Sequence, residues 1–271
     1  MKKVIMSLCL TAHVFAVFCQ QFHSGNTVRV MTYNVRNGIG LDNVTDYRRI
    51  ADVITRLCPD VVALQELDSV TNRSEQIDVL LRLSELTQMH SVYSASILFD
   101  GGKYGIGVLS KQPPLSWKRI PLPGREEQRS LLLVELPDYV FCCTHFSLNE
   151  EDRIASVLLV EEALKAYRKP AVLAGDINAT PDSPVLEIFR EKWKILSDPK
   201  QPTFPANNPQ VTIDYLFGYL PAEFVYSVRQ TQVVNEPVAS DHRPVFADIS
   251  FANLNTAVFC LGYRSYQSRF R

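Results

Sequence analysis

The sequence predicts an α/β domain in which a mixed sheet, or a pair of sheets, is covered by helices on the outside. In parts of the chain, helical hydrophobic periodicity alternates with short buried apolar runs, as in βαβ units. Elsewhere, apolar runs are separated by short turn segments, which indicates antiparallel hairpins. A plain doubly wound sheet would contain fewer hairpins, and the chain carries neither a GxGxxG nor a Walker-type phosphate loop.

The domain is predicted to begin with a strand–helix–strand unit. VRVMTYN, from Val28, alternates like a strand, and DYRRIADVITRL has its apolar residues at helical spacing. Pro59 and Asp60 break this helix, and the apolar run VVALQ is a buried strand that ends at Gln65. A second helix is predicted in SEQIDVLLRLSELT.

The middle and the end of the domain are richer in strands. SVYSASILF and YGIGVLS flank the loop DGGK, while SLLLVEL and YVFCCTHF flank Pro137 and Asp138, so we expect two hairpins. EEDRIASVLLVEEALKAY is a long amphipathic helix with one polar interruption, at Glu161. The remaining predicted strands are PAVLAGD, VTIDYLFG, EFVYSVRQTQVV and PVFADISF.

Length and charge limit the class of protein. The 271 residues fit a single α/β domain, and 46% of them are hydrophobic. The formal net charge of −1 excludes the strong basic excess expected of a general polyanion-binding protein, but not a local basic groove.

The N-terminus has the composition of a secretory signal. Two lysines precede an apolar stretch that is short for a membrane span and is interrupted by a histidine. We therefore predict a signal peptide over residues 1–19, cleaved after Ala16 or Cys19, and an exported protein that is periplasmic, cell-surface or secreted. The alternative is an uncleaved membrane anchor. The bulky Phe18 before Cys19 argues against a lipoprotein signal.

The predicted domain covers residues 28–251, and residues 252–271 are predicted to be a loosely ordered extension. This tail is free of acidic residues and has arginines among aromatics, so the alternative is a surface for nucleic acid or membrane. The cysteines beyond the signal have the spacing of neither a disulfide scaffold nor a zinc site, and they are interpreted as small apolar residues. They are Cys58, Cys142, Cys143 and Cys260.

Polar residues occur at the ends of several predicted strands. Taken singly, such an Asn or Asp is an ordinary cap or turn residue, and His145 is equally well a buried core histidine. Asp214 lies inside an apolar run, where a carboxylate needs a partner. Because strand-end loops converge on one rim in open α/β folds, we expect these residues to form one site. The set comprises Asn34, Glu66, His145, Asp176, Asn178, Asp214, Asp241 and His242.

This mixture of side chains suits metal-assisted hydrolysis of a phosphate ester. Mg²⁺ is bound by one or two carboxylates and leaves room for phosphate oxygens, so Glu66 fits, with Asn34 as a neutral helper. Neighbouring histidines and thiolates are too few to favour zinc. An Asp–His pair fixes the imidazole tautomer and supports its charged form.

The motifs TYN, LQE, YGIGVLS, THF, GDIN, ID and SDH, in this order, resemble the exonuclease/endonuclease/phosphatase superfamily, which includes exonuclease III, DNase I and neutral sphingomyelinases. The resemblance spans residues 28–250, nearly all of the chain beyond the predicted signal. It implies a four-layer α/β sandwich, with two mixed β-sheets packed face to face and helices on the outside. It also implies a phosphoesterase that depends on Mg²⁺ or Mn²⁺.

The resemblance assigns the metal site to Glu66, supported by Asn34, with Asp241 as a further metal-side carboxylate. It implies that Asp176 orients or deprotonates the attacking water and that Asn178 holds the phosphate or the water.

The remaining catalytic assignments are also implied by the resemblance. Asp214 would orient His242, which contacts the phosphate. Tyr104 would lie near the phosphate or leaving group, the alternative being a half-buried strand aromatic. His145 would protonate the leaving group or bind a phosphate oxygen. Arg129 is interpreted as a solvated charge at the start of a strand, with a phosphate contact as the alternative.

The expected function is an exported phosphodiesterase that acts on nucleic acid or on phospholipid or sphingolipid headgroups, by in-line attack of an activated water. The alternatives are a phosphomonoesterase for a small exported or inositol-type phosphate and a catalytically silent binding module. The silent module is disfavoured because every motif residue is present, and a serine hydrolase because no G-x-S-x-G elbow occurs. The only partner implied is the phosphoester substrate. No obligate protein partner is implied, and we expect a monomer.

Overall fold

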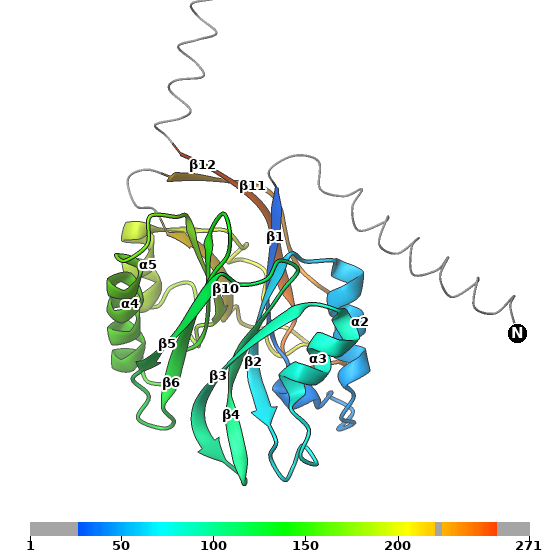
Figure 1. The fold of residues 1–271 in the computed structure, drawn as a ribbon. Helices are drawn as coiled ribbons and strands as arrows, with labels where there is room; N and C mark the ends of the chain where they lie inside the picture. The colour runs from blue at the N-terminus through cyan, green and yellow to red at the C-terminus, as the bar shows by residue number, and fades with distance from the viewer. Residues whose placement is uncertain (1–26, 220–223, 254–271) are drawn as a thin grey trace, which may run out of the picture.

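The computed structural model describes residues 27–219 and 224–253. In this part of the chain, two six-stranded sheets pack face to face and helices lie outside each of them (Figure 1). Both sheets are mixed, since each contains one parallel pair among antiparallel ones. The predicted four-layer α/β sandwich is therefore confirmed.

The strands of the first sheet come from the two ends of the domain. They are β1 (Val28–Asn34), β2 (Val61–Ser69), β3 (His90–Phe99), β4 (Gly102–Ser110), β11 (Phe224–Val233) and β12 (Val245–Asn253). Their order across the sheet is β11–β12–β1–β2–β4–β3.

The second sheet is formed by the middle of the chain. Its strands are β5 (Ser116–Leu122), β6 (Arg129–Glu135), β7 (Val140–His145), β8 (Ala171–Asp176), β9 (Trp193–Ile195) and β10 (Asp214–Tyr219). Their order is β5–β6–β7–β8–β10–β9.

The helices divide between the outer faces. Helices α2 (Tyr47–Leu57) and α3 (Val79–Thr87) cover the first sheet, and α4 (Glu150–Leu164) and α5 (Pro184–Lys192) cover the second (Figure 1). A short 3-10 turn, η1 (Arg36–Gly38), follows β1.

Alternation along the strands produces the layers. In β8, Val172 and Ala174 face the other sheet, whereas Ala171 and Leu173 face the helices. Because side chains of a strand point alternately to opposite faces, an apolar run such as AVLA serves two cores at once. The adjacent Cys142 and Cys143 divide in the same way, as expected, and both are buried free thiols.

Four details differ from the sequence-based expectations. Helix α3 begins at Val79, because Glu75 and Gln76 have positive φ and the carboxylate of Asp78 caps the helix by accepting from the Leu81 amide. Strand β2 continues past Gln65 to Ser69. Strands β5 and β9 and helix α5 were not predicted. Cys58 is disulfide-bonded, so the prediction that all four cysteines are simply small apolar residues is wrong for Cys58.

Among the described residues there is no helix with the length and apolar character needed to cross a bilayer. The predicted signal peptide over residues 1–19, the anchor that was its alternative, Cys260 and nearly all of the 252–271 extension lie outside the described residues. These stay predictions.

Candidate active site

The strand pairing gathers the predicted polar residues at one edge of the inter-sheet layer. Parallel pairing sets Asn34 beside Gln65 in the first sheet and His145 beside Asp176 in the second. The antiparallel β10 begins there too, with Asp214 opposite Asp176. The alternation that directs Val172 and Ala174 between the sheets directs Asp176 there as well.

Asn34 links the two sheets at this edge. Its Nδ2 donates to Glu66 Oε1 of the first sheet at 2.9 Å and to Asp176 Oδ2 of the second at 3.2 Å. Its Oδ1 accepts from the backbone N–H of Arg36 at 3.1 Å. The amide nitrogen faces both carboxylates and the oxygen accepts from the backbone, so Asn34 holds the two acids in position.

A β-bulge directs Glu66 toward this edge. Leu64 pairs with Gly107 and Leu67 pairs with Gly105, so β2 carries one extra residue between them. Glu66 adopts a φ of 60°, in the left-handed region. Leu64 and Leu67 consequently both pack under the helices, and Glu66 is free to turn toward Asn34.

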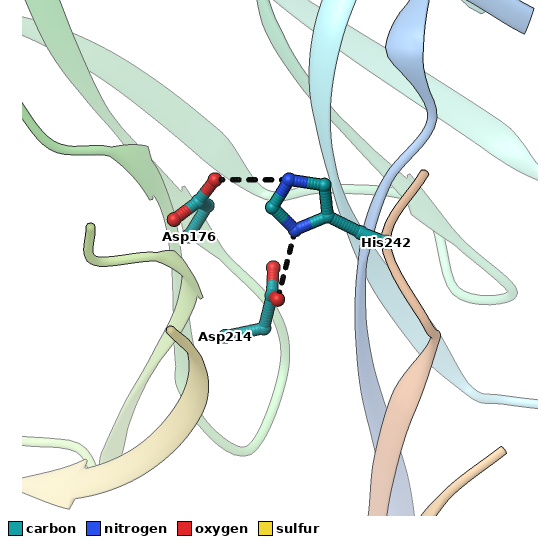
Figure 2. A group of neighbouring side chains, drawn as sticks. All are labelled: Asp176, Asp214 and His242. Atoms are coloured by element: carbon teal, nitrogen blue, oxygen red, sulfur yellow. Dashed lines mark hydrogen bonds and ion pairs between the residues drawn. The ribbon is translucent and has the colours of Figure 1, made fainter. Parts of the chain in front are cut away.

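Asp214 and His242 form a buried pair. His242 Nδ1 lies 2.9 Å from Asp214 Oδ2 (Figure 2). Burial alone lowers the pKa of His242, but the carboxylates of Asp214 and Asp176 outweigh it and raise the pKa to about 10. The imidazole is therefore charged at neutral pH, with a hydrogen on each nitrogen.

Asp176 is the centre of the cluster. Its Oδ2 lies 3.7 Å from His242 Nε2 (Figure 2) and 3.5 Å from His145 Nε2. Its Oδ1 accepts from the backbone N–H of Asn178 at 2.9 Å. Burial, reinforced by the Asp214 charge, raises the pKa of Asp176 above its usual range. A carboxylate whose basicity is raised in this way suits proton transfer near neutral pH.

His145 is buried and neutral. Burial lowers its pKa well below the usual value, and the charges of Arg129 and His242 lower it further. A neutral imidazole donates or accepts a hydrogen bond but does not act as an imidazolium acid. Of the two roles predicted for His145, binding a phosphate oxygen fits this environment better than protonating the leaving group.

Asn178 follows β8 of the second sheet, and Tyr104 lies on β4 of the first. Asn178 has a φ of 52° and donates through Nδ2 to the backbone oxygen of Phe146 at 2.9 Å. Tyr104 is half-buried on β4, its ring centroid 5.9 Å from that of Phe99. Burial and then the Glu66 carboxylate raise the pKa of the Tyr104 hydroxyl, which stays protonated as a hydrogen-bond donor.

Asp241 reaches the site from the segment before β12. The hydroxyl of Ser240 donates to the backbone oxygen of Asn34 at 2.8 Å and lies 3.3 Å from Asp241 Oδ1. Asp241 Oδ2 lies 3.8 Å from Arg36 Nε. Asp241 thus joins the cluster beside His242, although its direct side-chain contacts are with Ser240 and Arg36 rather than with Glu66.

Arg129 is not the solvated charge that the sequence suggested. It is 6% exposed, and Glu126 and Glu127 hold it at 3.2 and 3.1 Å. Its charge acts on both His145 and Tyr104, so it borders the site. The sequence signal was the acidic pair just ahead of it, since a buried guanidinium needs carboxylate partners.

The side-chain atoms available as ligands determine where a divalent ion fits. Asp176, Asp214 and His242 offer atoms within 4.8 Å of one another, close enough to hold an ion. Within this group, however, Asp214 Oδ2 and His242 Nδ1 already face each other at 2.9 Å, so the pair is engaged with itself. The carboxylates of Glu66 and Asp241 are hard oxygen donors of the kind that Mg²⁺ prefers, so the residues present fit such an ion.

Replacing Asn34 with alanine is expected to lower metal-supported turnover by about 10- to 100-fold, because outer-shell groups that hold ligand carboxylates have effects of this size. The variant removes the N–H donors of both Glu66 and Asp176. Turnover and metal affinity are measured together, with Asn207→Ala, an exposed asparagine, as the control. An unchanged metal affinity and rate would contradict the positioning role.

Comparisons with known proteins show which proteins the chain resembles. An endonuclease/exonuclease/phosphatase from Beutenbergia cavernae is 27% identical, with a TM-score of 0.70 over 83% of this chain and 72% of its own. The mannosyl-6-phosphatase Bt3783 of Bacteroides thetaiotaomicron is 18% identical, with a TM-score of 0.65 over 82% and 99% of the two chains. The human Nocturnin catalytic domain is 17% identical, with a TM-score of 0.64 over 84% and 95%. The last two likenesses show the fold alone.

None of the curated proteins compared with the chain matches it significantly. The sequence model of the Endonuclease/Exonuclease/phosphatase family matches residues 31–242, which include every residue of the cluster. Members of this family are hydrolases that act on phosphoesters and depend on divalent metal ions. The chain therefore belongs to the endonuclease/exonuclease/phosphatase family and is a phosphoesterase.

Proposed function

We propose that the chain is a Mg²⁺- or Mn²⁺-dependent phosphodiesterase that hydrolyses its substrate by in-line attack of an activated water. The observation that carries the proposal is the environment of one oxygen, Asp176 Oδ2. It lies 3.2 Å from Asn34 Nδ2, 3.5 Å from His145 Nε2 and 3.7 Å from His242 Nε2. One buried acid is thus surrounded by an amide that also holds Glu66 and by two imidazoles.

Each side chain has a part in the proposed reaction. Asp176 accepts the proton of the attacking water, and Asn178 holds the water or the phosphate. His242, charged and fixed by Asp214, donates to a phosphate oxygen where negative charge accumulates. A cation bound by Glu66 and Asp241 would supply Lewis-acid polarisation of the phosphate. His145 and the Tyr104 hydroxyl offer further hydrogen bonds.

The charge balance at the rim favours a diester. Arg36, Arg73 and Arg129 border the site, and each is already paired with carboxylates. A phosphomonoester carries close to two negative charges at pH 7 and a diester carries one. None of these three arginines is left unpaired to meet the second charge of a monoester, so the proposed substrates are diesters of nucleic acids or of phospholipid or sphingolipid headgroups.

The test is hydrolysis of bis-p-nitrophenyl phosphate before and after chelation. We expect EDTA to abolish the activity and Mg²⁺ or Mn²⁺ to restore it, since Glu66 and Asp241 are left without an ion to bind the phosphate. Hydrolysis that survives thorough chelation would refute the metal dependence.

The same preparation is then assayed on plasmid DNA, RNA, sphingomyelin and soluble inositol phosphates. p-Nitrophenyl phosphate serves as the monoester control, because the mannosyl-6-phosphatase of B. thetaiotaomicron shares this fold. A higher kcat/KM for the monoester would replace the proposed diesterase with a phosphomonoesterase.

We also propose that the protein is exported. The proposal is supported by the two lysines and the apolar stretch within residues 1–19. N-terminal sequencing of protein recovered outside the cytoplasm is expected to begin after Ala16 or Cys19. An intact Met1 on the recovered protein would favour the uncleaved anchor.

A further inference from the structure

A short segment before β10 contacts both residues of the Asp214–His242 pair. We call residues 203–206 the strap. Its two ends are tied to the neighbours of His242: the Ala206 N–H donates to the Asp241 backbone oxygen at 2.7 Å, and the Arg243 N–H donates to the Thr203 oxygen at 2.8 Å. Arg243 Nε also donates to the Ala206 oxygen at 2.7 Å. The strap is therefore fixed to the chain on both sides of the catalytic imidazole.

The strap also holds the other member of the pair. The hydroxyl of Thr203, which is fully buried, accepts from the backbone N–H groups of Ile213 at 3.2 Å and Asp214 at 3.3 Å. A two-way bridge between Phe204 and Val211, at 3.0 Å in each direction, closes the strap into a loop that leads to Asp214. The strap thus holds both the backbone of Asp214 and the backbone on either side of His242.

Phe204 supplies the remaining contact. Its ring centroid lies 4.8 Å from that of His242, with the planes 47° apart. The bond to Asp214 fixes Nδ1 of His242 but leaves the ring able to tilt about that bond. An aromatic surface packed on one side removes this freedom and so determines where Nε2 points, which is the atom 3.7 Å from Asp176.

We propose that the strap is a positioning element for the reaction, in which Phe204 sets the tilt of the His242 imidazole and the Thr203 hydroxyl sets the place of Asp214. The inference rests on the proposed function, since it concerns the imidazole that is to contact the phosphate. Phe204 and Thr203 act through other residues, so their effect falls on the rate of the chemical step rather than on substrate binding.

The test compares Phe204→Leu with Phe204→Tyr. Leucine fills much of the space but has no ring, whereas tyrosine keeps the ring. With bis-p-nitrophenyl phosphate and Mg²⁺, Phe204→Leu is expected to lower kcat by about tenfold at constant KM, because small misplacements of a catalytic group have effects of this order or larger. Phe204→Tyr is expected to retain the wild-type kcat. Trp117→Leu, an exposed aromatic on β5, is the matched control.

A second readout does not depend on turnover. The Nδ1 proton of His242, bonded to Asp214, is followed by NMR, and its signal is expected to shift or broaden in Phe204→Leu but not in Phe204→Tyr. If Phe204→Leu does not fold, Thr203→Val against Thr203→Ser gives the same comparison, since valine keeps the shape and loses the hydroxyl.

The possible results distinguish a failure of the strap proposal from a failure of the proposed function. A fall in kcat together with a changed His242 signal supports the strap. An unchanged kcat, a raised KM alone, or a lowered kcat with an unchanged signal overturns it, the last two because Phe204 would then touch the substrate. A wild-type protein that hydrolyses no phosphoester, while its His242 signal responds to Phe204→Leu, overturns the proposed function and leaves the contact intact.

Discussion

Replacing Asp176 with asparagine is expected to lower kcat by about 10²- to 10⁴-fold, the range found when a positioned general base is lost. The side chain keeps its size, and the change removes the negative charge and the basicity and puts an amide NH2 group in place of one oxygen. Asn34, His145 and His242 all lose the carboxylate oxygen that they face. Burial and the Asp214 charge raise the pKa of this acid, and an amide has no equivalent function.

The measurement is single-turnover hydrolysis of bis-p-nitrophenyl phosphate with saturating Mg²⁺, alongside circular dichroism to establish the fold. Asp138→Asn is the matched control, because Asp138 is exposed in the turn at the opposite end of β7. A folded Asp176→Asn protein with a nearly normal rate would remove Asp176 from its proposed role.

Much of this arrangement follows from alternation that the sequence displays. Residues of β8 two apart share a face, so Asp176 continues the line of Val172 and Ala174 that packs between the sheets. In the sequence, these alternate positions are two apolar residues followed by one polar residue. The convergence of several strand-end residues was predictable for this reason, and the described structure brings them to one edge.

Other features are not local. The bulge that turns Glu66 adds one residue to β2 relative to β4, and register is set by pairing with a distant strand. Phe204 contacts His242, which lies 38 residues further along the chain. No sequence pattern around either residue predicts this contact.

Replacing His242 with glutamine is expected to lower kcat by about 10²- to 10³-fold, as loss of a donor to developing oxyanion charge does. Replacing Asp214, the hydrogen-bond partner of His242, allows a more specific prediction. Asp214→Asn removes the charge that, against the cost of burial, raises the pKa of His242 to about 10, and it should therefore reduce the rate by a similar factor.

The double variant distinguishes a pair from two independent groups. If Asp214 acts only through the imidazole, the His242→Gln and Asp214→Asn losses do not add, and the double variant is about as slow as His242→Gln alone. Rates that multiply would mean that Asp214 contributes separately, for instance through its second oxygen, Oδ1, which is buried without a hydrogen-bond partner among the described residues. Because the 2.9 Å contact is the closest that Asp214 makes with a charged group, we expect the losses to overlap almost completely.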